Sequence, residues 1–198
     1  MSNAERELLR EIKEFTVTAL IVLLIWTLLR QPWRRRPVAR EVVMALFIAF
    51  MAGLLHLTLN GRWDDPAAML ARAIDRLRTG KKIHLQPLHT IGPQLRSFFQ
   101  QTTAWSQLLG NVLLFMPWGF CLPLLWPRFR KPLRMVGMAL SLTCLIEFTQ
   151  LFINRYVEVD DILLNFTGAM LGTGAWYLLH RLFPRLDAFL HDTPQGGS

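Results

Sequence analysis

The stretch SLTCLIEFTQLFINRYVEVDDILLNFTGAML, residues 141–171, connects two long apolar runs through a short polar turn. The first run, 135–153, contains one charged residue, Glu147, and the second, 162–179, contains none. A helix crosses the hydrocarbon core of a bilayer with about 20 mostly apolar residues, which each run supplies. Connections of about eight residues or fewer are typical between neighbouring helices of a bundle. The stretch therefore predicts two adjacent, antiparallel membrane-spanning helices.

Three further apolar runs, 15–29, 42–60 and 105–126, extend this pattern over most of the chain. Of the 198 residues 52% are hydrophobic and only 18% are charged, and the charges gather between the runs, which is typical of a membrane protein. Each run must be helical, because lipid offers no hydrogen-bond partner to the backbone. The sequence thus predicts an all-α transmembrane bundle of about five spans, with 15–29 as an uncleaved anchor.

The net charge of +8 predicts orientation in a membrane rather than nucleic-acid binding, because the basic residues flank the apolar runs. Segment 30–41 holds five Arg and segment 127–134 holds four Lys or Arg, so we expect both in the cytoplasm. This orientation in the inner membrane places the N-terminus on the outer side and the C-terminus in the cytoplasm. It also places the loop 61–104 outside, although this loop carries seven Lys or Arg. We divide the chain into an N-terminal tail, anchor and basic loop (1–41), a transmembrane domain (42–180) and a cytoplasmic tail (181–198).

The loop 61–104 contains the signals of a short amphipathic helix. Asp65 is placed to cap its N-terminus, Pro66 suits the first helical position and Gly80 suits the position just past its end. The helical spacing collects an apolar stripe: Leu70, Ala73, Ile74 and Leu77. Such a helix can lie on the bilayer surface, over the bundle or against other loop residues, and the sequence leaves these three open.

Polar side chains inside the spans gather near one end of the bundle. Counted from the predicted span ends at 1.5 Å per residue, they lie about 4–9 Å deep. They are Glu147, Gln150, Asn165, Asn111 and His56. Polar residues within a membrane span face the bundle or a water-filled cavity, and they mark functional sites. We therefore expect an outward-facing polar cleft among the last three spans.

Helical spacing assigns several of these residues to shared faces. Glu147 and Gln150 are three residues apart, and a second face carries Asp161, Asn165, Gly168 and Gly172. The spacing of Gly168 and Gly172 allows a neighbouring helix to approach closely, while Pro117 can kink its own span.

Three segments carry a resemblance to a known family: NVLLFMPWGF (111–120), IEFTQLFINRYVEVDDILLNFTGAMLG (146–172) and HLQPLHTI (84–91). Together they resemble the VanZ-like family of bacterial membrane proteins over residues 42–180. The matching positions are Asn111, Phe115, Pro117, Gly119, Glu147, Gln150, Arg155, Asp160, Asp161, Asn165 and Gly168. In the third segment, His84 and Leu88 stand where the family pattern has Asn and Phe. The resemblance implies a cell-envelope membrane protein, and the family's namesake is associated with resistance to teicoplanin.

The sequence leaves three hypotheses for function. The first is binding of an envelope lipid or a lipid-linked precursor, with Arg155 on phosphate or paired with Asp160 or Asp161. The second is an enzyme acting on a lipid-linked phosphate, with Glu147 as acid or base and the two aspartates on a divalent cation. The third is an assembly subunit or a small transporter. No metal-ligand spacing, cofactor motif or oligomeric state is predicted.

The candidate residues fall into three groups. Glu147 and Asp161 are the candidate catalytic carboxylates. The candidate ligand-binding residues are Asn111, Gln150, Arg155, Asp160 and Asn165. The candidate helix-packing residues are Pro117, Gly119, Gly168 and Gly172.

Overall fold

The computed structural model describes residues 37–88, 91–92 and 102–185, together with the single helical positions Thr16, Leu20, Leu24 and Thr27. The chain divides into two compact units, one of residues 1–58 with 179–198 and the other of residues 59–178. The second unit contains all of the candidate catalytic, ligand-binding and helix-packing residues.

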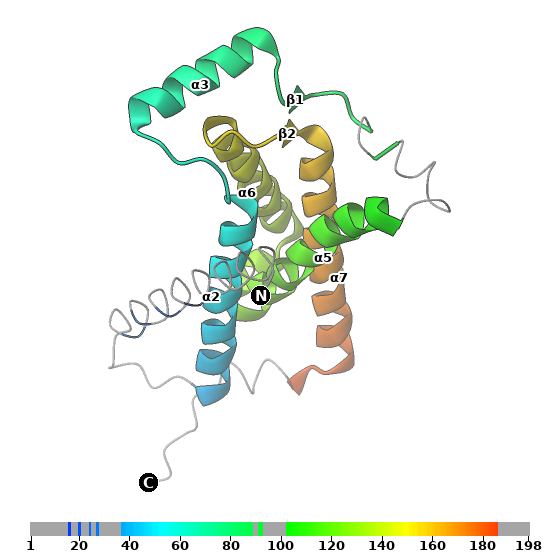
Figure 1. Ribbon diagram of the computed structural model, residues 1–198. Helices are drawn as coiled ribbons and strands as arrows, with labels where there is room; N and C mark the ends of the chain where they lie inside the picture. The colour runs from blue at the N-terminus through cyan, green and yellow to red at the C-terminus, as the bar shows by residue number, and fades with distance from the viewer. Residues whose placement is uncertain are drawn as a thin grey trace. The chain divides into compact units, whose positions relative to one another are not determined.

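Four described helices are long and apolar enough to cross a membrane (Figure 1). They are α2 (Val38–Thr58), α5 (Thr102–Leu125), α6 (Pro132–Phe152) and α7 (Val159–Leu182). They confirm the all-α prediction and four of the predicted spans. The predicted span 15–29 lies almost entirely outside the described residues.

Helix α3 (Pro66–Thr79) confirms the short helix predicted in the loop 61–104. The Asp65 carboxylate accepts hydrogen bonds from the backbone N–H groups of Ala67 and Ala68, at 3.0 and 3.1 Å. Gly80 ends the helix in the left-handed conformation with φ 69°, which glycine adopts without steric cost. Both ends of α3 are therefore set by the local sequence.

Helices α5 and α7 pack backbone against backbone through glycines. A Cβ atom added to Gly172 would lie 2.0 Å from Met116 O, and one added to Gly119 would lie 2.0 Å from Ala169 O. A Cβ atom added to Gly168 would lie 2.2 Å from Val112 O. Because no side chain fits at these positions, their small size sets the distance between the two helices.

Three short elements complete the described part of the second unit. Strands β1 (Ile83–His84) and β2 (Val157–Glu158) form a parallel pair, which joins the loop after α3 to the turn between α6 and α7. The 3-10 helix η1 (Pro127–Arg130) connects α5 to the N-terminal end of α6, whereas the strand pair lies at the C-terminal end of α6. The helical periodicity of the sequence gave no sign of the strand pair, which is only two residues long.

Candidate functional site

The candidate site lies where α6 ends and α7 begins. There Asn111 of α5 donates a hydrogen bond from Nδ2 to Oδ1 of Asp161 on α7, at 2.7 Å. Asn165 and Gly168 follow Asp161 at helical spacing, and Gly168 contacts the α5 backbone. The face of α7 predicted from spacing is therefore the face that packs on α5.

Glu147 of α6 is 2% exposed, which is a low value for a carboxylate. Its Oε2 accepts a hydrogen bond from the backbone N–H of Glu158, at 2.9 Å, directly before the first residue of α7. A carboxylate suits this position, because the first N–H groups of a helix carry a partial positive charge. Among the described residues, Oε1 has no hydrogen-bond partner.

Within the described part of the second unit, Asn165 is the other residue with a buried oxygen that has no hydrogen-bond partner. The residue is 4% exposed, and its Oδ1 has no partner within the described part of the chain. Leaving a buried acceptor unpaired costs about 1–3 kcal/mol, so two such atoms in one region require an explanation. Both atoms are acceptors, and they would be satisfied by hydroxyl or amine donors.

We use the name polar cluster for Asn111, Glu147, Gln150, Asp161 and Asn165. Glu147 interacts electrostatically with Asp161 as well as with Glu158 and Arg155. Gln150 is 5% exposed and lies about one turn beyond Glu147 on α6. The structure therefore groups the carboxylates and amides that the sequence predicted at this end of the spans. His56 lies in the last turn of α2, which belongs to the other unit, and we do not include it in the polar cluster.

Asp160 is adjacent to Asp161 in sequence, but its carboxylate binds different partners. It is 2% exposed, and its two carboxylate oxygens accept hydrogen bonds from the backbone N–H groups of Leu88 and Ile91, at 2.6 and 3.0 Å. The carboxylate thus holds the segment that follows β1 against the start of α7. Each oxygen already accepts one backbone N–H, so a divalent cation at Asp160 would have to share the carboxylate with these two donors.

We expect Asp160→Asn to loosen this segment, because the amide places an N–H donor where two backbone donors need acceptors. Hydrogen bonds to a charged acceptor contribute about 1.5–3 kcal/mol each. Hydrogen exchange at the Leu88 and Ile91 amides should therefore accelerate by about tenfold or more. Asp75→Asn, at an exposed position of α3, is the matched control, and equal exchange in both variants would contradict the assignment.

Arg155 does not form an ion pair with Asp160 or Asp161, which is one of the two alternatives that the sequence left open for it. Its exposed guanidinium donates to Asn60 O at 3.3 Å, and within the described residues no carboxylate lies at ion-pair distance from it. The reason is that Asp160 is turned toward the Leu88 and Ile91 amides. Arg155 nevertheless interacts electrostatically with Glu147 and Asp161, so its charge lies at the border of the polar cluster.

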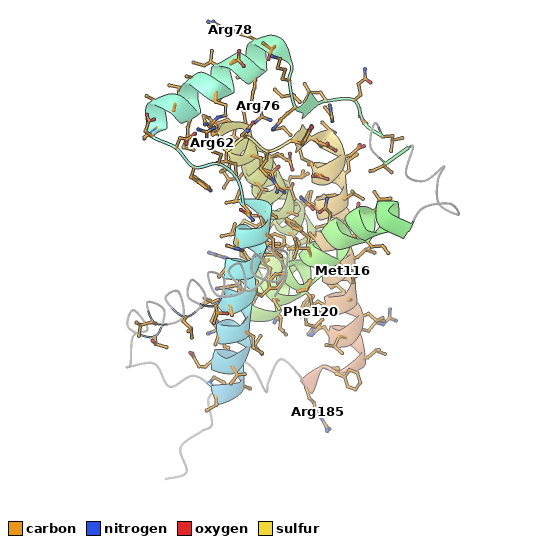
Figure 2. The ribbon with its side chains drawn as sticks, in the orientation of Figure 1. Arg62, Arg76, Arg78, Met116, Phe120 and Arg185 are labelled. Atoms are coloured by element: carbon orange, nitrogen blue, oxygen red, sulfur yellow. The ribbon has the colours of Figure 1, made fainter. Side chains whose placement is uncertain are left out.

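The sequence analysis missed Arg76, which is 3% exposed although it carries a charge (Figure 2). Its Nη1 donates to Gln150 O and Leu151 O, at 3.0 and 2.6 Å, in the last turn of α6. Its remaining donors reach the carbonyls of Lys82 at 3.0 Å, Lys81 at 3.4 Å and Arg155. A guanidinium has five N–H donors, and here five carbonyls accept them. Burial, together with the nearby charge of Arg72, lowers the pKa of Arg76.

Arg72 extends this contact along the end of α6. It donates to Phe152 O at 2.8 Å and pairs with Asp64, and this bond lowers the pKa of the Asp64 carboxyl. The last carbonyls of a helix lack partners within the helix and carry partial negative charge, which explains why two arginines bind there. The four-residue spacing of Arg72 and Arg76 places them on one helix face, but spacing alone did not show that this face is buried.

His84 lies in β1 beside the site. Its Nδ1 lies 3.2 Å from Oε1 of Glu158, the residue whose N–H binds Glu147. Because β1 pairs in register with β2, residue 84 lies opposite residue 158. The strand pair therefore connects the loop after α3 to the polar cluster.

Four long apolar helices with carboxylates and amides buried at the α6–α7 end define an integral membrane protein with a polar site near one end of its spans. The chain belongs to the VanZ-like family, since the VanZ/LLP1 family model matches residues 15–180. This match includes the apolar run 15–29, which the resemblance over residues 42–180 left out. No curated protein and no solved structure matches the chain.

Proposed function

We propose that the polar cluster binds the polar headgroup of an envelope lipid or of a lipid-linked envelope precursor. The observation that carries this proposal is the pair of buried acceptor oxygens without described partners, Glu147 Oε1 and Asn165 Oδ1. Headgroups that carry hydroxyl or amine groups supply the missing donors. A site near the end of the spans also suits a ligand whose acyl chains stay in the bilayer.

The residues around the cluster complete the recognition of such a headgroup. The exposed Arg155 guanidinium is available to a phosphate, which it can bind through two parallel hydrogen bonds. The bond between Asn111 and Asp161 holds the carboxylate of Asp161 in position. In this proposal Glu147 and Asn165 select the headgroup, while Arg155 contributes affinity for its phosphate.

The distribution of basic residues supports a site on the outer face of the inner membrane. Four basic residues lie in or beside η1, at the end of α6 opposite to the polar cluster: Arg128, Arg130, Lys131 and Arg134. Cytoplasmic loops are enriched in Lys and Arg, so we place η1 inside and the polar cluster outside. Binding of a cell-wall precursor there would alter the response to glycopeptides of the teicoplanin type.

The other two hypotheses have less support. The enzymatic alternative retains Glu147 as acid or base, and a cation at Asp160 would have to share that carboxylate with the Leu88 and Ile91 amides. Among the residues that the structure describes, no three His, Cys, Asp or Glu side chains are grouped to hold a metal ion. The glycines that would serve an assembly subunit are used inside this chain, between α5 and α7.

The test is the amount of envelope lipid that remains bound to the purified protein, quantified by mass spectrometry. We expect Glu147→Gln and Asn165→Leu each to reduce the retained headgroup lipid by about tenfold, the effect of losing one hydrogen bond of about 1.4 kcal/mol. Glu41→Gln is the matched control, because Glu41 is a buried carboxylate of α2 at 8% exposure.

The same variants should change glycopeptide susceptibility in complemented cells at equal expression, whereas the Glu41 variant should not. Retention of wild-type lipid by both cluster variants would refute the proposal. Metal-dependent turnover of a lipid phosphate that is lost in Glu147→Gln would favour the enzymatic alternative instead.

A further inference from the structure

Helix α3 exposes an apolar stripe that the second unit does not bury. Leu70, Ile74 and Leu77 are 54%, 41% and 65% exposed, and they recur at the spacing of one helix face. Ala73, which the sequence grouped with them, is 2% exposed and lies on the docked side of the helix. The stripe therefore consists of three large side chains without cover, rather than the predicted four.

The position of α3 is fixed by arginines and not by this stripe. Arg76 and Arg72 bind the last carbonyls of α6, so α3 lies across the end of a membrane-spanning helix (Figure 1). Figure 2 shows Arg76 on the side of α3 that faces α6 and Arg78 on the opposite side. A helix across the end of a span lies at the level where hydrocarbon gives way to headgroups.

From these contacts we infer that α3 is an interfacial helix, with Leu70, Ile74 and Leu77 inserted among the lipids around the bundle. The occupant of the stripe is the bilayer itself. Large apolar residues on one helix face with cations beside them are the composition of helices that lie in a membrane interface. This inference does not depend on the ligand of the polar cluster.

The charges around the stripe favour lipid over a second copy of the chain. Three exposed basic residues, Arg62, Arg78 and Lys81, flank it, together with the half-buried Lys82. Two copies meeting through this face would bring like charges together, whereas anionic headgroups complement them. Trp63, 58% exposed, lies just before α3 and has the amphipathic ring that is enriched at membrane interfaces.

The test uses a fluorescent label on single cysteines in the full chain, with Cys121 and Cys144 replaced by alanine. The labelled variants are Leu70→Cys, Ile74→Cys and Leu77→Cys, with Ala71→Cys and Asp75→Cys as controls on another face of the same helix. In vesicles of phosphatidylcholine and phosphatidylglycerol with brominated acyl chains, we expect about threefold stronger quenching on the stripe than at the controls. Aqueous iodide should give the reverse order.

Equal iodide quenching on both faces would overturn the inference by placing the stripe in water. Weak quenching of the stripe by both agents would also overturn it, because another protein surface would then cover the stripe. A measurement on the unaltered protein guards against misfolded variants, using lipids with a photoreactive group on the acyl chain. Adducts at Leu70, Ile74 and Leu77 support the inference, and adducts confined to the long spans contradict it.

Discussion

Arg76→Met is expected to detach α3 from the end of α6. Methionine has a similar length but no donor, so Leu151 O loses its Arg76 partner and Gln150 O keeps only the backbone N–H of Arg155, at 3.2 Å. Each buried carbonyl left without a partner costs about 1–3 kcal/mol, so a total loss of about 3 kcal/mol or more is expected. Hydrogen exchange over residues 66–79 and 150–155, in detergent or nanodiscs, measures this loss of stability. Both segments should exchange at least about 100-fold faster than in the wild-type protein.

Arg78→Met is the matched control for this prediction, because Arg78 is exposed on the same helix. It removes one charge and leaves the α6 carbonyls bonded, so exchange should stay near the wild-type rate. Arg76→Lys should behave like Arg76→Met, since an ammonium with three donors cannot reproduce a planar group with five. Wild-type exchange in Arg76→Met would show that α3 is held by other contacts.

Gly172→Ala is expected to have the second large effect, by forcing α5 and α7 apart. The added methyl group would lie 2.0 Å from Met116 O, and backbone atoms cannot move aside as a flexible side chain can. Overpacking of a well-packed interior costs about 1–3 kcal/mol and more when backbone must shift. We expect a lower melting temperature of the purified protein, and a loss of retained lipid as Asn111 and Asp161 separate.

Gly174→Ala supplies the control on the same helix, since a Cβ there would meet no atom within 4 Å. Replacing glycine by alanine at such an exposed helical position removes backbone freedom from the unfolded chain, so this variant should melt at or slightly above the wild-type temperature. Gly119→Ala should destabilise like Gly172→Ala, because it meets the Ala169 carbonyl. Equal melting of the variants at 172 and 174 would contradict the close approach of the helices.

Much of the fold was predictable, because it depends on signals that are local in sequence. Long apolar runs with at most one charged residue predicted four described spans, and the cap residues Asp65 and Gly80 predicted both ends of α3. The gathering of polar residues near one end of the spans needed only the rise of a helix per residue. These features involve one element at a time, so no knowledge of distant partners was required.

The roles of individual polar residues were less predictable, because they depend on residues far apart in the chain. Asp160 and Asp161 are neighbours, but helical rotation of about 100° per residue points one toward the Leu88 and Ile91 amides and the other toward Asn111. Because the two carboxylates are directed at these partners, neither forms the ion pair with Arg155 that the sequence left open.

The sequence by itself determined the class of protein, because hydrocarbon requires long apolar helices whatever their arrangement. Only the tertiary structure decided which charges are buried, since burial depends on what the neighbouring element presents. Arg76 and Arg78 are the same residue type, two positions apart on one helix. The end of α6 covers the side chain of Arg76 and leaves that of Arg78 exposed. A charged side chain is stable in the interior only where enough hydrogen-bond partners converge, and here those partners come from segments about 75 residues apart.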